Sequence, residues 1–327
     1  MEQADSPESP LATAAESVGP AAAAFELLGN EARLAILVAL WDAHEPFGDG
    51  TAVGFSELRR RVGVADSGQF NYHLEKLTDH FVESTPAGYR LGEPGRKFVR
   101  AVVAGAGIEE PTLERTEIDM SCTLCGGAVE VLAEDGWVYN VCTECDGLFA
   151  DPDSPTGHLS KFRIDPAGFT DRSPAEVYAA AWVSAFQHLY SMIEGVCPSC
   201  SGPIDRSLVR CGAHDESGVC DECGRRAAVV AGFACPVCKD WAQTTLGGVA
   251  KYHPAAVAFH YERGLSLQYG FNDLASINER LARGSTDWEL LDEDPLRVRV
   301  TLELDGDELA LDLAEDLSVV DVREPSS

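Results

Sequence analysis

Eleven cysteines carry most of the chemistry that this 327-residue sequence offers. Ten of them form five Cys-x-x-Cys pairs, and Cys211 stands three residues before His214. A Cys-x-x-Cys pair offers two thiolates from one turn, and two such pairs complete a tetrahedral zinc site. Disulfides are rare in a reducing compartment, so this many paired thiols indicates bound metal there.

The first two pairs have the spacing of a zinc ribbon. Sixteen residues separate them, and segments 128–132 and 137–141 within that interval have the pattern of two strands joined by a turn at 134–136. Such a hairpin brings the second pair over the first, so that four sulfurs lie at about 2.3 Å from zinc. Thiol redox activity is the alternative, but a thioredoxin-type pair opens a helix after a strand, whereas these pairs precede Gly or Asp. The predicted ligands are Cys122, Cys125, Cys142 and Cys145.

A second region holds eight further candidate ligands, enough for two more tetrahedral zinc ions. A sequential pairing joins Cys197, Cys200, Cys211 and His214 in one site and Cys220, Cys223, Cys235 and Cys238 in the other. A cross-braced pairing joins the first pair with the third and the second with the fourth, in the order of RING domains. The five residues that follow His214 are a longer gap than that pattern has. The spacing leaves both pairings open and does not indicate a ubiquitin ligase.

Protein side chains fill every position of the three predicted zinc sites, so we expect all three ions to be structural. The sequence has no nucleophile beside a base, no phosphate-binding loop and no metal with an open position, and we expect the protein not to be an enzyme. His158 is expected to be exposed, and His253 and His260 to be structural.

Segment 55–91 has the pattern of a helix, a turn, a second helix and a β-hairpin. Ser56 can cap the first helix and Gly63 can end it. The second helix starts at Ser67, and the hairpin spans 82–91. One buried face recurs at helical spacing, with Phe70, Leu74, Leu77 and Phe81. This order of elements predicts a winged helix-turn-helix.

The opposite face of the second helix carries side chains that can contact base edges or phosphates. They are Gln69, Tyr72, His73 and Lys76, with Asn71 at the margin of the face. Arg90, on the returning strand of the hairpin, is placed to contact a phosphate. We therefore predict that this segment binds double-stranded DNA.

The charge of the chain is strongly acidic, with 25 basic and 54 acidic residues, a net charge of −29. Only five of the basic residues are Lys, and this composition resembles that of proteins from extreme halophiles. Such a field repels phosphate. However, residues 25–107 hold nine basic and eleven acidic residues, a net of −2, whereas residues 284–327 hold three against fourteen, a net of −11. The predicted DNA-binding segment is thus largely spared the negative charge of the rest of the chain.

The segments FELLGNEARLAILVAL, FSELRRRVGV and SGQFNYHLEKL resemble the ArsR-type winged-helix repressors over about 80 residues. That family carries a Leu-Gly-x-x-x-Arg-Leu-x-Ile-Leu segment and a recognition helix of the form x-x-x-His-Leu-x-x-Leu. The resemblance implies a homodimer formed through the terminal helices and a palindromic operator. Metal-sensing members place Cys-x-Cys before the recognition helix, or acidic and His ligands on the last helix, and FSELRRRVGV and GRKFVRAVVAG contain neither. The whole chain resembles haloarchaeal ArsR-like regulators with Cys-rich C-terminal extensions.

The predicted organisation has six parts. Residues 1–19 form a disordered tail, 20–107 the winged helix, 118–150 a zinc ribbon, 151–195 a connector with a helix, 196–240 a two-zinc module and 241–327 an acidic α+β region. Within the winged helix we expect helices at 21–28, 31–42 and 93–104, the second with Leu34, Leu37, Leu40 and Trp41 turned inward. Residues 108–117 are expected to be a linker.

Regular elements are also predicted in the second half of the chain. The pattern Ser173-Pro174-Ala175-Glu176 opens a helix that runs to Ile193. Further helices are expected at 254–264, with Val257 and Tyr261 on its apolar side, and at 273–283. A hairpin turns at Asp305-Gly306, and its first strand has one apolar face, formed by Val298, Val300, Leu302 and Leu304.

The sequence therefore predicts a multidomain α+β protein that acts as a sequence-specific, dimeric transcriptional regulator with three structural zinc ions. The alternative is an adaptor, in which the zinc modules bind proteins of the transcription machinery and the winged helix docks a protein. The acidic N-terminal residues include no cationic n-region, so we expect no secretory signal. No apolar run approaches the roughly 18 to 20 residues that span a bilayer. We therefore expect a cytoplasmic protein without a membrane partner. The operator, the effector and the sign of regulation stay open.

Overall fold

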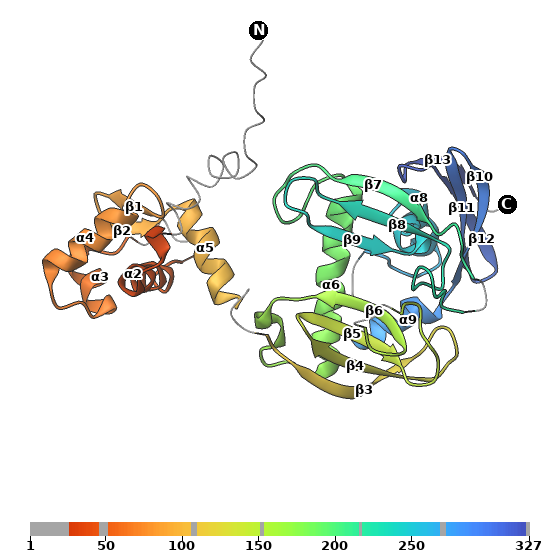
Figure 1. Ribbon diagram of the computed structural model, residues 1–327, viewed down its shortest axis with the longest axis horizontal. Helices are drawn as coiled ribbons and strands as arrows, with labels where there is room; N and C mark the ends of the chain where they lie inside the picture. The colour runs from red at the N-terminus through yellow and green to blue at the C-terminus, as the bar shows by residue number, and fades with distance from the viewer. Residues whose placement is uncertain are drawn as a thin grey trace, which may run out of the picture. The chain divides into compact units, whose positions relative to one another are not determined.

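The computed structural model describes residues 26–45, 52–105, 110–150, 154–215, 218–268 and 273–324. The chain forms two compact units that divide between Ile108 and Glu109. Unit 1 consists of helices and one hairpin, and unit 2 contains three antiparallel sheets with helices packed on them (Figure 1). The predicted α+β class is confirmed. The predicted disordered tail, 1–19, lies outside the described residues.

Unit 1 is built from short, well-capped helices. Its described elements are α2 (Glu31–Trp41), α3 (Phe55–Val62), α4 (Ser67–Leu77), β1 (Val82–Thr85), β2 (Gly88–Leu91) and α5 (Glu93–Val103). The side chain of Asn30 caps α2 by accepting a hydrogen bond from the amide of Arg33 at 3.2 Å. Asp66 caps α4 in the same way, with the amide of Gln69 at 2.7 Å. These caps satisfy amides that have no partner within the helix.

One hydrophobic core holds the elements of unit 1 together. β1 and β2 form an antiparallel hairpin in which Val82 faces Leu91, and Val53 forms a bridge to Tyr89 beside it. The buried side chains come from α2, α3, α4, the hairpin and α5, and they include Leu37, Leu40, Leu58, Phe70, Leu74, Leu77, Val82, Leu91 and Val99. The predicted buried face of the second helix is therefore confirmed.

Three details of unit 1 differ from the prediction. Helix α3 begins at Phe55 with Gly54 at the N-cap, so Ser56 is not the cap. Leu34 is 37% exposed and does not point into the core, whereas Leu37 and Leu40 do. The helix expected at 21–28 is described only from residue 26, where its last three residues are helical.

The first sheet of unit 2 has four antiparallel strands in chain order. They are β3 (Leu113–Ser121), β4 (Ala128–Glu134), β5 (Trp137–Cys142) and β6 (His158–Arg163). The expected linker at 108–117 therefore contains the start of β3, and the expected connector at 151–195 contains β6. The expectation that His158 is exposed was wrong, because its side chain is 1% exposed and packs between the rings of Tyr139 and Phe149.

Helix α6 (Pro174–Ile193) connects two cores within unit 2. It begins with the predicted capping box, in which Ser173 and Glu176 bond reciprocally. Val177, Tyr178 and Ala181, in its first half, pack on the β3–β6 sheet together with Ile277 of α9 (Leu274–Ala282). Met192, near its end, belongs to the second core. Figure 1 shows α6 passing from the first sheet to the second.

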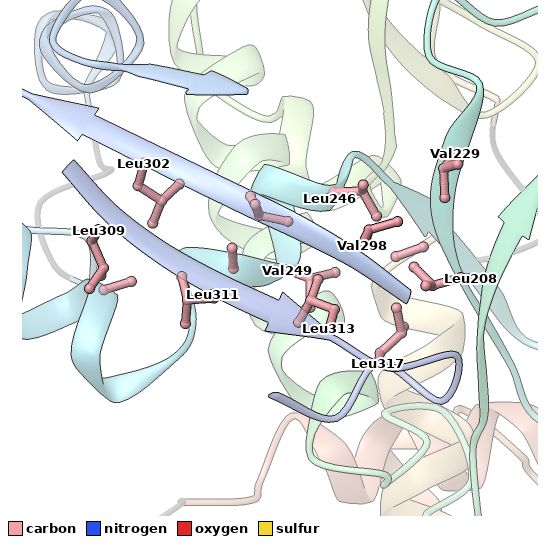
Figure 2. Packing of buried hydrophobic residues seen from close by; sticks show 14 of the residues in the cluster. Leu208, Val229, Leu246, Val249, Val298, Leu302, Leu309, Leu311, Leu313 and Leu317 are labelled. Carbon is pink, nitrogen blue, oxygen red and sulfur yellow. The ribbon is translucent and has the colours of Figure 1, made fainter. Parts of the chain in front are cut away.

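The second core lies between the two remaining sheets. One contains β7 (Asp205–Arg210), β8 (Val229–Ala234) and β9 (Trp241–Thr244), and the other contains β10 (Ser285–Glu293), β11 (Leu296–Leu304), β12 (Asp307–Leu313) and β13 (Val319–Arg323). Figure 2 shows leucines and valines of β11 and β12 facing Leu246 and Val249 of α7 (Leu246–Ala250) and Leu208 and Val229 of the smaller sheet. The predicted regions 196–240 and 241–327 thus share one core.

In this region α8 (Pro254–Glu262) and α9 were predicted and α7 was not, and one face of α8 differs from the prediction. Helix α8 buries Ala256 and Phe259, while Tyr261, expected on its apolar side, is 74% exposed. The predicted hairpin at Asp305-Gly306 joins β11 and β12, and the apolar face of β11 is buried as expected. No helix in the described ranges is long and apolar enough to cross a membrane.

Candidate metal centres and the exposed face of α4

Three groups of four ligands lie in unit 2, and in each group the ligand atoms are within 4.8 Å of one another. Site 1 contains Cys122, Cys125, Cys142 and Cys145. Site 2 contains Cys197, Cys200, Cys235 and Cys238. Site 3 contains Cys211, His214, Cys220 and Cys223. All twelve predicted ligands are therefore gathered into three sets of four, which suit metal ions such as zinc.

Each of the five Cys-x-x-Cys pairs lies in a turn that we call a knuckle. Sites 1 and 2 contain two knuckles each, and site 3 contains one, that of Cys220. In four of the five knuckles, the amide of the first Cys donates to the carbonyl oxygen of the residue five positions after it. The amide of the residue four positions after this Cys donates to the carbonyl oxygen of the Cys. For the pair at Cys197 these bonds are 2.9 Å to Gly202 and 2.8 Å from Ser201. These backbone bonds therefore hold the two sulfurs of a knuckle on the same side of the turn.

The distances between sulfurs agree with a tetrahedral ion. In site 1, Cys122 Sγ lies 3.8 Å from Cys145 Sγ, and Cys125 Sγ lies 3.4 Å from Cys142 Sγ. In site 2 the corresponding distances are 3.5 Å between Cys197 and Cys238 and 3.6 Å between Cys200 and Cys235. Four sulfurs at about 2.3 Å from zinc lie about 3.8 Å apart. The donor sets and spacings therefore fit zinc.

Backbone amides favour the thiolate form that binds metal. The amides of Leu124 and Glu144 lie 3.4 and 3.3 Å from the sulfurs of Cys122 and Cys142. In site 2 the amide of Cys238 lowers the pKa of the Cys235 thiol to about 7. In site 3 the amide of Asp215, 3.4 Å from the sulfur, lowers the pKa of Cys220 to about 7 as well.

The pairing within the second region is nested, so both predicted pairings were wrong. β7 and β8 are antiparallel, with Asp205 opposite Ala234 and Arg210 opposite Val229. The pair at 197 and 200 precedes β7 and the pair at 235 and 238 follows β8, so these four cysteines meet at one end of the two strands. The ligands between the strands form site 3 at the other end. Strand pairing, which the ligand spacing does not reveal, decides the outcome.

Site 3 combines three thiols and one imidazole. His214 Nδ1 lies 3.5 Å from Cys223 Sγ, and His214 Nε2 lies 3.2 Å from the carbonyl oxygen of Arg226. An Nε2–H group that donates to this carbonyl leaves the Nδ1 lone pair for the metal, which is how outer contacts orient metal-binding imidazoles. Nδ1 is therefore the ligand atom that the geometry favours.

Arg226 was not among the predicted functional residues, although it connects two of the sites. Its amide donates to the carbonyl of Leu148 at 2.9 Å, and its Nε donates to the carbonyl of Gly147 at 3.0 Å. Both carbonyls follow directly on the second knuckle of site 1. Its position two residues after a glycine that ends a knuckle is the only sequence signal, and that signal carries no information about the partner.

In unit 1, the exposed face of α4 carries most of the predicted DNA-binding side chains. Gln69, Tyr72 and Lys76 are exposed, with Tyr72 at 54%, and Asn71 is half-buried. Lys76 Nζ lies 5.8 Å from the centre of the Tyr72 ring, and Asn71 Nδ2 donates to Glu75 at 2.7 Å. On the hairpin, Arg90 forms an ion pair with Glu83 at 2.8 Å.

His73 does not belong to this exposed face. Its side chain is 8% exposed, and its ring lies 5.4 Å from that of Tyr72. The helix turns 100° per residue, which places residue 73 beside the buried Phe70 and Leu77 rather than between Tyr72 and Lys76. The predicted contact of His73 with DNA is therefore withdrawn.

Three arginines on α3 are engaged within unit 1. Arg60 and Arg61 both bind Glu57, at 2.6 and 2.9 Å, and hydrogen bonds from these two guanidinium groups lower the pKa of Glu57. Arg59 donates to the carbonyl of Ala65 at 3.0 Å, in the turn before α4. The two ion pairs lie within α3, and the bond from Arg59 connects α3 to the turn.

An apolar groove of about 400 Å³ lies between α2 and α5. It is lined by Leu34, Leu37 and Val38 on α2 and by Phe98, Val99 and Val102 on α5. Leu34 and Val38 are 37% and 40% exposed, so apolar side chains are open to solvent along this groove.

Comparisons with known proteins identify two families of undetermined role. Residues 21–102 match the family described as "Domain of unknown function (DUF7347)". Residues 119–319 match the family described as "Domain of unknown function (DUF7351)". No curated protein matches the chain. Since the second match includes all three metal sites and covers more than half of the chain, the protein belongs to the DUF7351 family.

Proposed function

We propose that the protein is a sequence-specific DNA-binding transcriptional regulator of the cytoplasm, with a winged helix-turn-helix of the ArsR type as unit 1. The observation that carries the proposal is the exposed face of α4, where Gln69, Tyr72 and Lys76 share one side of the helix. This helix follows α3 through a short turn and precedes the hairpin β1–β2. The order of elements and the polar, exposed face are those that a major-groove helix needs.

In this proposal α4 enters the major groove and the hairpin lies along the backbone. The amides of Gln69 and Asn71 can each bond an adenine edge, and the Tyr72 hydroxyl can bond a base or a phosphate. Arg90 would exchange its bond to Glu83 for one to a phosphate oxygen. Arg60 and Arg61 on α3 form ion pairs with Glu57, and the cation that α4 itself offers is Lys76.

We further propose that the regulator is a homodimer formed through the groove between α2 and α5. The half-exposed Leu34 and Val38 support this, because burying apolar side chains against a second copy removes them from water. A symmetric dimer places two α4 helices for two half-sites about one helical turn of DNA apart.

The three metal sites have a structural role in this proposal. Zinc supplies no reaction here, since four protein ligands complete each shell. The metals instead hold together knuckles and loops of unit 2 that contribute few buried apolar side chains of their own.

The test is a selection of sheared genomic DNA by the zinc-loaded, full-length protein in molar KCl, followed by sequencing. We expect one short inverted repeat to be enriched. If the folded, metal-loaded protein retains no preferred sequence, the DNA-binding proposal is wrong and the alternative, a protein-binding adaptor, gains support.

Substitutions then identify the contacts. At molar KCl counterion release adds little affinity, so Gln69→Ala should weaken binding to the selected repeat by about tenfold, since a bidentate base contact contributes about 1–3 kcal/mol. Arg90→Ala should have a smaller effect in molar KCl than at low salt. Gln243→Ala, at an exposed glutamine of β9 in unit 2, is the matched control and should bind like the unchanged protein. If Arg90→Ala weakened binding to the repeat in molar KCl and Gln69→Ala did not, this assignment would be wrong.

A further inference from the structure

Two chain segments that follow metal knuckles pair with each other. The segment Gly147–Ala150 follows the second knuckle of site 1, and the segment Gly224–Arg226 follows the Cys220 knuckle of site 3. Phe149 and Arg225 form an antiparallel bridge, the amide of Ala150 donates to the carbonyl of Gly224 at 2.8 Å, and that of Arg226 donates to Leu148. Sites 1 and 3 are therefore joined by a short two-stranded contact, although their ligands are far apart in sequence.

Arg226 links this contact to a ligand of site 3 through hydrogen bonds. Its carbonyl faces Nε2 of His214 at 3.2 Å, while its amide and its guanidinium both bond the segment after site 1. The same residue thus fixes the orientation of a predicted metal ligand and holds the carbonyls of Gly147 and Leu148. One residue, Arg226, therefore contacts both His214 and the segment that follows site 1.

Backbone hydrogen bonds hold the segment Gly147–Ala150 from two sides. On one side, the amides of Leu148 and Phe149 donate to the carbonyl of His158 on β6 at 2.8 and 3.1 Å. On the other side lie Gly224, Arg225 and Arg226. Only Gly224–Arg226 belong to a metal site. Losing their contacts should therefore loosen the segment Gly147–Ala150 without unfolding the β3–β6 sheet.

Site 3 lies in a stretch with little regular secondary structure. Between the end of β7 and the start of β8, the described residues 211–215 and 218–228 include no helix and no strand of a sheet. The four ligands fall within residues 211–223, and a loop of this kind takes its conformation from the ion that it binds. Its imidazole ligand also makes it the one site of the three that is not built from four thiols.

We propose that metal bound in site 3 stabilises metal bound in site 1, with Arg226 as the residue that couples them. Filling site 3 orders Gly224–Arg226, which restrains Gly147–Ala150 and thereby Cys142 and Cys145. Metal should then leave site 1 more slowly when site 3 is filled, and the coupling is reciprocal in affinity. The proposal rests on the metal occupancy proposed above and is independent of DNA binding.

The experiment follows the release of metal from each site by thiol labelling. Full-length protein is loaded with zinc, its metal content is measured, and it is then exposed to a chelator and an alkylating reagent for increasing times. Trypsin separates the sites, because the cysteines of site 1 all lie in 116–161, those of site 3 in 211–225, and those of site 2 in 173–206 and 227–239. Mass spectrometry of these peptides gives one labelling rate per site.

Two variants and one control isolate the coupling. His214→Ala removes a ligand of site 3, and Arg226→Ala keeps all twelve ligands while removing the side-chain bond to Gly147. Arg206→Ala is the matched control, because Arg206 also donates to a backbone carbonyl, that of Ile193 at 2.8 Å, away from the contact between the sites.

We expect labelling of the site 1 peptide to accelerate by at least about fivefold in His214→Ala, in the range of ordinary coupling between sites. A smaller acceleration is expected in Arg226→Ala, and none in Arg206→Ala. The rates of the site 2 peptides should not change in any variant. Unchanged labelling of site 1 in His214→Ala would overturn the proposal, as would an equal acceleration at site 2, which indicates general destabilisation. A metal content of zero in the unchanged protein would refute the occupancy itself, whatever the DNA selection shows.

Discussion

Gly157 lies against the second knuckle of site 1, where no side chain has room. Its φ is +82°, and a Cβ atom there would overlap the carbonyl oxygen of Cys142, a residue whose amide bonds the carbonyl of Gly157 at 2.8 Å. Gly126, in the first knuckle, has a similar φ of +80° but no atom within 4 Å of the same position. Comparing an alanine substitution at each of these glycines therefore distinguishes the cost of backbone strain from the cost of steric overlap.

Gly157→Ala should lower the free energy of unfolding of unit 2 by more than about 3 kcal/mol, because overlap with a ligand's backbone must be relieved by moving the knuckle. Gly126→Ala, the control, should cost only about 1 kcal/mol, the strain of a left-handed alanine. Chemical denaturation of the zinc-loaded protein measures both. Equal losses in the two variants would show that packing against Cys142 is unimportant.

At the scale of elements, α2 and α5 leave an apolar groove open among the residues that the structure describes. Their groove is apolar, and the exposed Val38 lies at its edge. Val38→Glu should convert the proposed dimer into a monomer while leaving the helices folded, because a carboxylate is costly to bury in an apolar interface without a partner. Sedimentation velocity in molar KCl measures the oligomeric state.

The control for this prediction is Val320→Glu, at a valine of β13 that is 51% exposed in unit 2. It adds the same charge outside the groove and should leave the oligomeric state unchanged. If Val38→Glu and the unchanged protein sediment alike, the groove does not form the dimer.

At the scale of the whole molecule, the candidate metal ligands all lie in unit 2. Every cysteine lies between residues 122 and 238, so unit 1 contains none and is held by its apolar core. Structural zinc contributes about 10–16 kcal/mol in small zinc-binding peptides. A folded domain is stable by only roughly 5–15 kcal/mol, so the loss of one such ion removes a large part of its stability.

Removal of metal by excess chelator should therefore abolish or strongly lower the thermal transition of unit 2 while leaving that of unit 1 in place. Differential scanning calorimetry of the full-length protein separates the two transitions. The control is the same chelator saturated with zinc before it is added. Loss of both transitions together would show that unit 1 cannot fold without unit 2.

The local features of the chain were predictable because they depend on neighbouring residues. The capping box at Ser173 and Glu176, the hairpin at Asp305-Gly306 and the buried face of α4 follow from patterns within a few positions. β6 was missed because a strand of six residues is recognised mainly by its pairing, here with β5. His73 and Leu34 were misplaced for a related reason, since burial depends on which elements pack against each face.

By itself, the sequence determined which side chains can bind metal, because ligand chemistry and the reach of a Cys-x-x-Cys turn are local properties. It also determined the α+β class and the exposed residues Gln69, Tyr72 and Lys76 on α4. Only the tertiary structure decided which ligands share a site, since the antiparallel pairing of β7 and β8 brings residues 197 and 238 together and sets site 3 apart. It likewise decided that Arg226 joins site 3 to site 1, because a contact across 79 residues depends on how the two segments pack and not on the sequence near either one.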